Sequence, residues 1–456
     1  MSRKASPIVV SVAILVAAGC STGASGGAGG GTGGQSRPAQ GGAVQGGAGG
    51  TPGSGGGADA GAGGGGGAGR GGSSGTNDSG ASGNAGGGGG SPVDAARDIG
   101  GAAAESGVAG ADGGTARDAA TTEAGGTTCT ATTLKAAANC TGRLFGAALA
   151  ASHLGESGYA TAAREHSFVT PENEMKWDQI EPTRGAFNFA PGDQIVNFAT
   201  QNGLQIKGHT LVWHKQLPTW VTDLTNPSDI RAAMLAHING VMSHYRGRVT
   251  AWDVVNEAWV VSGDAGVGAP VIRDSVFSRA LGPGFIDEAF TAARQADSGA
   301  LLIYNEFGNE GLSDKATAVY DMIKDMKTRG IPIDGVGLQM HIGFNTAPTP
   351  DEVARNMQRF ADLGVKIFIS EMDVNGCAGY SLDQERAQYH DMVAACVAQP
   401  ACAAVTVWGI TDKFSWLNSD TRTGCATGQL PLPLLWDDNY AKKSAYTGAL
   451  DALLGQ

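Results

Sequence analysis

Two glutamates, Glu257 and Glu371, each follow a short apolar segment of strand character. The segments are Trp252–Asn256 and Lys366–Ser370, which are rich in the β-branched and aromatic residues that strands favour. A barrel of parallel strands carries its chemistry at the carboxyl ends of those strands. Two carboxyl groups that face each other across such a barrel end are the minimal machinery for cleaving a glycosidic bond. The remaining chain must therefore show whether it forms such a barrel.

Eight short apolar segments follow one another from about residue 144, and helical patterns separate them. Strands that alternate with helices indicate a parallel α/β architecture, and eight such units predict a (β/α)8 TIM barrel. The helical patterns are clearest at Ile230–Tyr245, Lys315–Arg329 and Pro350–Leu363. The predicted strands are Leu144–Leu149, Ser167–Thr170, Gln205–Val212, Ala251–Asn256, Leu301–Asn305, Val336–His341, Lys366–Ser370 and Val405–Trp408.

Polar and aromatic residues gather at the ends of these predicted strands. Each one alone has an ordinary structural explanation, because a single histidine, glutamate or tryptophan is usually a packed or ion-paired residue. The same excess at seven of the eight ends predicts one polar site at one end of the barrel. The residues are Glu172, Asn173, Lys176, Trp177, His209, Trp213, His214, Asn256, Glu257, Tyr304, Asn305, Glu306, Gln339, His341, Glu371, Asp373, Trp408 and Trp416.

Longer motifs surround the same residues. They are Thr170–Trp177 (TPENEMKW), Gly208–His214 (GHTLVWH), Trp252–Ala258 (WDVVNEA), Ile369–Asp373 (ISEMD), Trp408–Trp416 (WGITDKFSW) and Pro433–Asp437 (PLLWD). In these motifs and in their order, the chain strongly resembles glycoside hydrolase family 10, the endo-1,4-beta-xylanases, over roughly residues 134–454. Glu306 stands where the family usually has Asp, and Ser370 and Met372 where it usually has Thr and Leu. These conservative departures remove no reacting group.

The resemblance implies a retaining mechanism, in which two carboxyl groups lie about 5–5.5 Å apart. It implies that Glu371 is the nucleophile and that Glu257 is the general acid and then the general base. His341 is expected to donate a hydrogen bond to Glu371 as a neutral imidazole, oriented by Asp373. The resemblance places Asn256 at the 2-hydroxyl of the reacting sugar.

Gln339 is expected near the nucleophile as well. By the same resemblance, a set of polar and aromatic residues should contact the sugar on the glycone side: Glu172, Asn173, Lys176, His209 and Trp213. Trp408 and Trp416 should form sugar platforms that crowd the position of a 6-hydroxymethyl group, which xylose lacks. The implied partner is xylan or xylo-oligosaccharides, and neither a metal nor an organic cofactor is required.

Two other functions stay open. The first is a related barrel glycosidase that acts on β-1,4-glucan. The second is a surface protein that binds polysaccharide without cleaving it, although both glutamates are present. The net charge of -12 and a pI of about 5.1 argue against nucleic-acid binding, because no basic patch would meet the phosphates.

The N-terminal region has the form of a secretory signal. Residues 1–19 combine Arg3 and Lys4 with an apolar segment too short to span a bilayer. The sequence before Cys20 resembles a lipoprotein processing site, which predicts lipidation of Cys20; the alternative is an ordinary signal peptide. Residues 20–128 are rich in Gly, Ala and Ser and predict a disordered tether. We therefore expect a protein that is exported to the cell surface or outer membrane, or that is otherwise secreted. We expect it to be a monomer and to contact the membrane only through the lipid anchor.

Residues 129–456 form the predicted catalytic barrel. If Cys20 carries a lipid, six of the seven cysteines remain, and an even set in an exported protein predicts disulfides. Six cysteines allow fifteen connectivities, among which the sequence alone does not choose. Pairing neighbours gives Cys129–Cys140 and Cys396–Cys402, which leaves Cys377–Cys425. No clustered Cys/His spacing typical of a metal site occurs.

Overall fold

Eight parallel strands close into a barrel in the computed structural model, which describes residues 129–262, 268–343 and 348–456. Neighbours pair in the order β1, β2, β3, β4, β7, β8, β10, β11, and β11 pairs back with β1 to close the ring. The predicted TIM-barrel class is confirmed. The barrel strands are β1 (Leu144–Leu149), β2 (Phe168–Pro171), β3 (Gln205–Trp213), β4 (Ala251–Asn256), β7 (Leu301–Glu306), β8 (Gly335–Leu338), β10 (Lys366–Val374) and β11 (Cys402–Val407).

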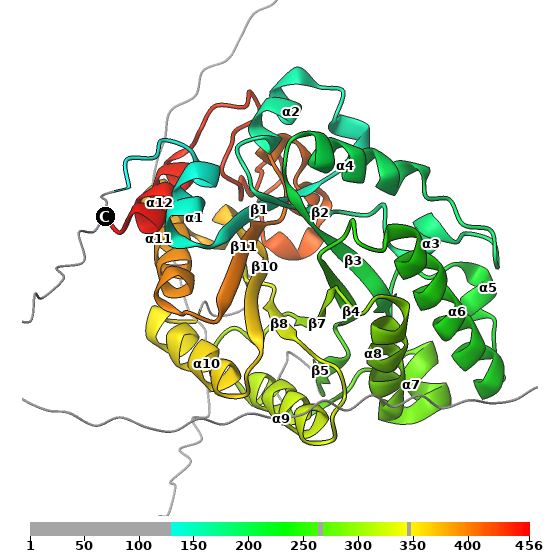
Figure 1. The fold of residues 1–456 in the computed structure, drawn as a ribbon. Helices are drawn as coiled ribbons and strands as arrows, with labels where there is room; N and C mark the ends of the chain where they lie inside the picture. The colour runs from blue at the N-terminus through cyan, green and yellow to red at the C-terminus, as the bar shows by residue number, and fades with distance from the viewer. Residues whose placement is uncertain (1–128, 263–267, 344–347) are drawn as a thin grey trace, which may run out of the picture. The chain divides into compact units, whose positions relative to one another are not determined.

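Helices surround this barrel on its outside, as Figure 1 shows. The α-helices are α1 (Leu134–Thr141), α2 (Ser157–Ala163), α3 (Trp177–Ile180), α4 (Ala190–Gln201), α5 (Thr219–Thr222), α6 (Pro227–Tyr245), α7 (Val276–Leu281), α8 (Phe285–Ala296), α9 (Asp314–Thr328), α10 (Pro350–Asp362), α11 (Leu382–Ala398) and α12 (Ser444–Leu454). Short 3-10 helices are Ala151–His153, Gly282–Gly284, Gly376–Ala378, Asp412–Phe414, Trp416–Ser419 and Thr421–Thr423. None of the helices in the described residues is both long and apolar enough to cross a bilayer.

Helix α10 illustrates how the sequence specifies these elements. Thr349 and Glu352 form a capping box around Pro350, the first helical residue, and such a cap stabilises a helix by about 1 kcal/mol. Val353 and Phe360 lie on one face of the helix, are fully buried and pack into the main apolar core between helices and strands. Burial of that face therefore fixes α10 against the barrel.

The sixth predicted strand is shorter than expected. Strand β8 ends at Leu338, and a separate two-residue strand, β9 (His341–Ile342), pairs with the end of β10. The break occurs because Met340 has a φ of 64°, which lies outside the conformation of a strand. An antiparallel hairpin of β5 (Trp259–Val261) and β6 (Pro270–Ile272), absent from the prediction, follows β4.

The barrel interior changes from apolar to polar along its axis. Phe168, Ala251, Ile303, Phe368 and Ala404 form a small apolar cluster from five strands. Because side chains alternate across a strand, the residues two positions further along point to the same interior. They are all buried and polar: Thr170, Asp253, Asn305, Ser370 and Thr406. The carboxyl end of the barrel therefore contains a polar layer directly beneath the predicted site.

Three disulfides join the six cysteines of the described residues. The pairs are Cys129–Cys140, Cys377–Cys425 and Cys396–Cys402, as expected from the sequence. The predictions for the signal segment 1–19, for Cys20 and for the tether 20–128 lie outside the described residues.

Candidate active site

One cleft of about 640 Å³ opens at the carboxyl ends of the strands. Every residue predicted as catalytic, supporting or substrate-binding lines it, except Asp373, which is fully buried behind it. The predicted residues that line the cleft are Glu172, Asn173, Lys176, His209, Trp213, Asn256, Glu257, Gln339, His341, Glu371, Trp408 and Trp416.

Glu371, on β10, is the more buried of the two glutamates, with 6% of its side chain exposed against 12% for Glu257. Its carboxylate oxygens accept hydrogen bonds from Asn305 Nδ2 at 2.6 Å and from His341 Nε2 at 3.3 Å. Burial opposes the charge, but the hydrogen bond from His341 and nearby positive charges lower the pKa of Glu371 to about 2. Glu371 is therefore ionised at neutral pH, as an attacking carboxylate must be.

His341 lies between two carboxylates. Its Nδ1 is 3.0 Å from Asp373 Oδ2, and its Nε2 faces Glu371. Burial by itself lowers the pKa of His341, but Asp373 and Glu371 outweigh it and hold this pKa well above its ordinary value. This direction favours the protonated imidazole, whereas a neutral one was expected from the sequence. Asp373 is held in turn by Trp416, whose Nε1 donates to the same Oδ2 at 2.8 Å.

Glu257 follows the last residue of β4 and has a φ of 56°. This left-handed conformation costs a non-glycine residue on the order of 1–3 kcal/mol. Its carboxylate accepts a hydrogen bond from Gln339 Nε2 at 3.2 Å and lies 3.9 Å from His214 Nδ1. Burial and the charge of Arg273 lower the pKa of His214 to about 4, so that imidazole is neutral at neutral pH. Glu257 thus accepts its hydrogen bond from an amide, whereas Glu371 also accepts one from His341.

Amide side chains connect the two glutamates. Gln339 contacts both Glu257 and Asn256 at 3.2 Å. The amide of Asn256 lies 2.9 Å from Nδ2 of Asn305, which also donates to Glu371 at 2.6 Å. A continuous chain of polar contacts therefore fixes the two carboxyl groups relative to each other.

The position of Asn305 depends on its neighbours in the polar layer. Its Oδ1 accepts a hydrogen bond from Ser370 Oγ at 2.6 Å. A Cβ atom on Gly337 would lie 2.0 Å from the same oxygen, which is closer than any real contact. Gly337 thus gives Asn305 the space to reach Glu371, and Ser370 orients its amide.

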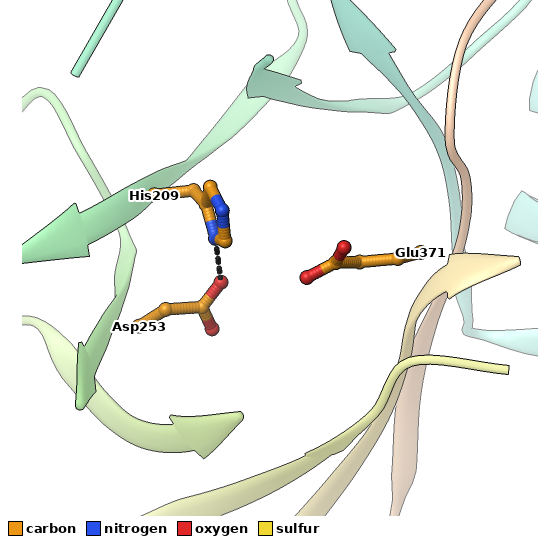
Figure 2. Close-up of side chains that lie close together, drawn as sticks. All are labelled: His209, Asp253 and Glu371. Atoms are coloured by element: carbon orange, nitrogen blue, oxygen red, sulfur yellow. Dashed lines mark hydrogen bonds and ion pairs between the residues drawn. The ribbon is translucent and has the colours of Figure 1, made fainter. Parts of the chain in front are cut away.

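His209, Asp253 and Glu371 lie close enough to share a metal ion, since one ligand atom of each falls within 4.8 Å of the others. His209 Nδ1 lies 2.8 Å from Asp253 Oδ2. Figure 2 shows this hydrogen bond, with Glu371 pointing toward the pair. The same Asp253 oxygen contacts the buried ammonium of Lys207 at 2.7 Å. Lys207 thus supplies the positive charge that a metal would bring, and the donor set fits an ion-pair network better than a metal site.

The predicted glycone-side residues lie together. Lys176 Nζ donates to Asn173 Oδ1 at 2.9 Å and lies 5.0 Å from the centre of the Trp213 ring. Burial raises the pKa of Glu172 to about 7, although the charge of Lys176 opposes the rise. Burial lowers the pKa of Lys176. This part of the cleft therefore combines polar donors and acceptors with an aromatic face, as a carbohydrate site does.

The two predicted platform tryptophans follow β11. The ring of Trp408 lies 5.1 Å from that of His209, and the ring of Trp416 lies 5.2 Å from that of His341. Trp408 is largely buried, with 6% of its surface exposed. Both rings are therefore packed against histidines of the site.

Sequence reasoning missed part of the lining. Arg273 follows the unpredicted hairpin β5–β6, and no motif pointed to it. Glu310 lies four residues beyond Glu306, close enough to a strand end to have been considered. The unpredicted lining residues are Lys215, Gln216, Arg273, Phe307, Gly308, Glu310, Met340, Ile342, Pro348 and Arg422.

Comparison with known proteins agrees with this geometry. Endo-1,4-beta-xylanase B of Thermotoga neapolitana is 40% identical over 290 residues, which cover 62% of this chain and 80% of that protein. Xylanase 10B of Thermotoga petrophila RKU-1, solved in complex with xylobiose, is 38% identical with a TM-score of 0.65, covering 71% of this chain and 97% of that one. Xylanase10C of Cellvibrio japonicus in complex with xylopentaose is 31% identical with a TM-score of 0.63, covering 69% and 68%.

The family model described as glycosyl hydrolase family 10 matches residues 133–452. This range contains the whole barrel and all the residues that line the cleft. The chain therefore belongs to glycosyl hydrolase family 10.

Proposed function

We propose that this protein hydrolyses internal β-1,4-xylosidic linkages of xylan with retention of configuration. The observation that carries the proposal is the pair of Glu257 and Glu371, linked by amide side chains in one cleft. Membership of the family and the xylanase names of the relatives give the substrate class. In two solved relatives, the bound ligands are xylobiose and xylopentaose.

The proposed reaction has two displacements. First, the ionised carboxylate of Glu371 attacks the anomeric carbon, while the glycosidic oxygen leaves with the proton of Glu257. Glu257, now a carboxylate, then takes a proton from water, whose oxygen attacks the same carbon and releases Glu371. Two inversions give net retention, and no cofactor takes part.

The surrounding groups support this division of roles. His341, held by Asp373, keeps Glu371 ionised until it attacks, because its hydrogen bond lowers the pKa of Glu371. Asn256, next to the acid/base, is proposed to bind the 2-hydroxyl of the reacting sugar, where hydrogen bonds strengthen in the transition state. Gln339 aligns Glu257.

Sugar binding is assigned to the remaining cleft residues. Trp408 and Trp416 are proposed to stack on pyranose faces and to exclude the 6-hydroxymethyl group of glucose. This exclusion favours xylan over β-1,4-glucan, and two intact carboxyl groups argue against a protein that binds without cleaving. The polar contacts of the glycone side are assigned to Glu172, Asn173, Lys176, His209 and Trp213.

We propose that the protein is exported by the signal in residues 1–19 and anchored by a lipid on Cys20. The Gly-rich residues 20–128 would then act as a tether for a monomeric catalytic barrel, residues 129–456, at the cell surface or outer membrane. Incorporation of radiolabelled palmitate that is lost in Cys20→Ser tests the anchor. Equal labelling of both proteins would refute it.

Product analysis tests the activity. The full-length protein is incubated with xylan and, separately, with carboxymethylcellulose, and the anomeric configuration of new ends is followed by NMR. We expect short xylo-oligosaccharides that are released first with the β-configuration. Faster release from the cellulose derivative would move the substrate to glucan, and no release from either polymer would refute hydrolysis.

Two variants test the assigned roles. Glu371→Ala should abolish hydrolysis with an intact fold, and near-normal rates would contradict its role as nucleophile. Glu257→Ala should slow poor leaving groups far more than activated aryl groups, because only poor leaving groups need a proton. Equal losses on both would contradict its role as acid.

A further inference from the structure

Glu306, the last residue of β7, has no exposed surface and does not line the cleft. Its Oε1 accepts hydrogen bonds from Lys315 Nζ at 2.8 Å and from the N–H of Phe307 at 3.2 Å. Its Oε2 accepts hydrogen bonds from the hydroxyl of Tyr304 at 2.7 Å and from the N–H of Trp259 at 3.0 Å. Besides its ion pair with Lys315, the buried side chain of Glu306 therefore also binds the backbone N–H groups of Trp259 and Phe307.

These contacts lead to the backbone that carries Glu257. The N–H of Glu257 donates to the carbonyl oxygen of Asn305 at 2.9 Å, and the N–H of Ala258 donates to the hydroxyl of Tyr304 at 3.0 Å. The N–H of Trp259 donates directly to Glu306. The end of β7 thus accepts hydrogen bonds from all three N–H groups of residues 257–259. One of the acceptors is Glu306 itself, and another is Tyr304, which is hydrogen-bonded to Glu306.

The three carbonyl groups of the same segment are bound by one residue. Arg273 donates from Nε to the carbonyl oxygen of Glu257 at 2.8 Å and from Nη2 to that of Trp259 at 3.1 Å. Its backbone N–H donates to the carbonyl oxygen of Ala258 at 2.7 Å. The segment is therefore held from two sides, by β7 and by Arg273.

This double hold explains how Glu257 keeps an unfavourable conformation. With a φ of 56°, Glu257 would relax to a negative φ if its neighbours allowed it, and its carboxyl group would then leave its place in the cleft. We infer that Glu306 is a positioning residue for Glu257: it fixes the backbone from which the proposed acid/base enters the cleft. The inference rests on the proposed function, because it assumes that Glu257 supplies the proton.

The test is the dependence of rate on the leaving group. Full-length wild-type protein and variants are assayed with aryl β-xylobiosides whose phenols range from activated to poor leaving groups. For Glu306→Gln and Tyr304→Phe, we expect kcat/KM to fall at least about tenfold on poor leaving groups and less than about threefold on activated ones. Glu306→Asp keeps the charge beside Lys315 and should lose less than Glu306→Gln. Tyr304→Phe removes only a hydroxyl, so the test remains decisive if Glu306→Gln does not fold.

Glu385→Gln is the matched control. Glu385 is also buried and pairs with a single lysine, Lys443, at 2.9 Å, but it belongs to α11 and does not line the cleft. Its loss should lower stability without changing the ratio of rates on poor and activated leaving groups. The same change of ratio in Glu385→Gln would refute a specific role of Glu306.

Wild type and Glu257→Ala in the same series separate the two hypotheses. If wild type cleaves none of the substrates, the proposed function fails and the inference with it. If Glu257→Ala shows the contrast between leaving groups but Tyr304→Phe and Glu306→Gln keep the wild-type ratio, the positioning role is refuted and the proposed function stands. If both variants shift the ratio in the direction of Glu257→Ala, the positioning role is supported.

Discussion

Replacing His341 should raise the pKa of the proposed nucleophile. In the intact site this pKa is about 2, against an ordinary value of 4.5, and the difference corresponds to about 3 kcal/mol in favour of the charged form. His341 contributes twice, through a hydrogen bond and through its charge, whereas His209 and Lys207 contribute through charge alone. We expect His341→Ala to remove at least roughly half of this energy, which moves the pKa of Glu371 to ~3 or higher.

The assay is kcat/KM against pH on an activated aryl xylobioside. Glu371 must be ionised to attack, so activity is lost as pH falls through its pKa in the free enzyme. Raising that pKa moves the acidic limb to higher pH. His341→Gln, which retains a donor but not the charge, should give an intermediate shift. His390→Ala is the control, because His390 lies on α11, pairs with Asp391 and does not line the cleft.

Circular dichroism at each pH separates loss of activity from unfolding. An acidic limb that stays in place in His341→Ala, with only the maximal rate reduced, would show that His341 does not set the ionisation of Glu371. An equal shift in His390→Ala would attribute the effect to the net charge of the protein.

Three further measurements address other parts of the molecule. Burial raises the pKa of Glu172 to about 7, so KM for xylo-oligosaccharides should change around pH 7 in wild type and not in Glu172→Gln. An identical dependence of KM on pH in both proteins would exclude Glu172 as the cause of that change. Trp408→Ala should raise kcat/KM for cello-oligosaccharides relative to xylo-oligosaccharides by about tenfold, and an unchanged ratio would contradict steric exclusion. Removing the disulfide Cys377–Cys425, which spans 48 residues, should lower the free energy of unfolding by about 4 kcal/mol. Removing Cys396–Cys402, which spans 6 residues, should lower it by about 2 kcal/mol. Denaturant titration measures both values, and the reverse order would contradict the loop-entropy explanation.

The sequence predicted the barrel because its two main signals agree. Apolar segments of strand length alternate with helical patterns, and polar residues recur where the strands end. The strands β1 and β4 match their predicted bounds, since both are buried segments flanked by polar or small residues. The hairpin β5–β6 was not predicted, because three-residue strands carry too little periodicity to be separated from a loop.

The positions that the sequence could not predict depend on tertiary contacts. Met340 takes a φ of 64° although methionine has no preference for that conformation. Its N–H and that of Gly308 both donate to Glu310 Oε1 at 3.1 Å, so a carboxylate from another loop stabilises the turn. The direction in which the pKa of His341 shifts was not foreseen for a similar reason. One neighbouring carboxylate was considered as an orienting group, but the joint effect of two on the charge was not.

The two glutamates acquire different chemistry from different supports. Glu371 is controlled by charge: Lys207, His209 and His341 lower its pKa against the effect of burial. Glu257 is controlled by geometry, because its N–H donates to β7 and its carbonyl oxygen accepts from Arg273, which holds its backbone at a positive φ. Variants of the first support should therefore move pH profiles, and variants of the second should change leaving-group dependence. The two supports meet at Asn305, whose Nδ2 donates to Glu371 and whose carbonyl oxygen accepts from the N–H of Glu257. A His341→Ala, Tyr304→Phe double-mutant cycle should therefore show coupling in the free energy of activation, and additive effects would show that the two supports act independently.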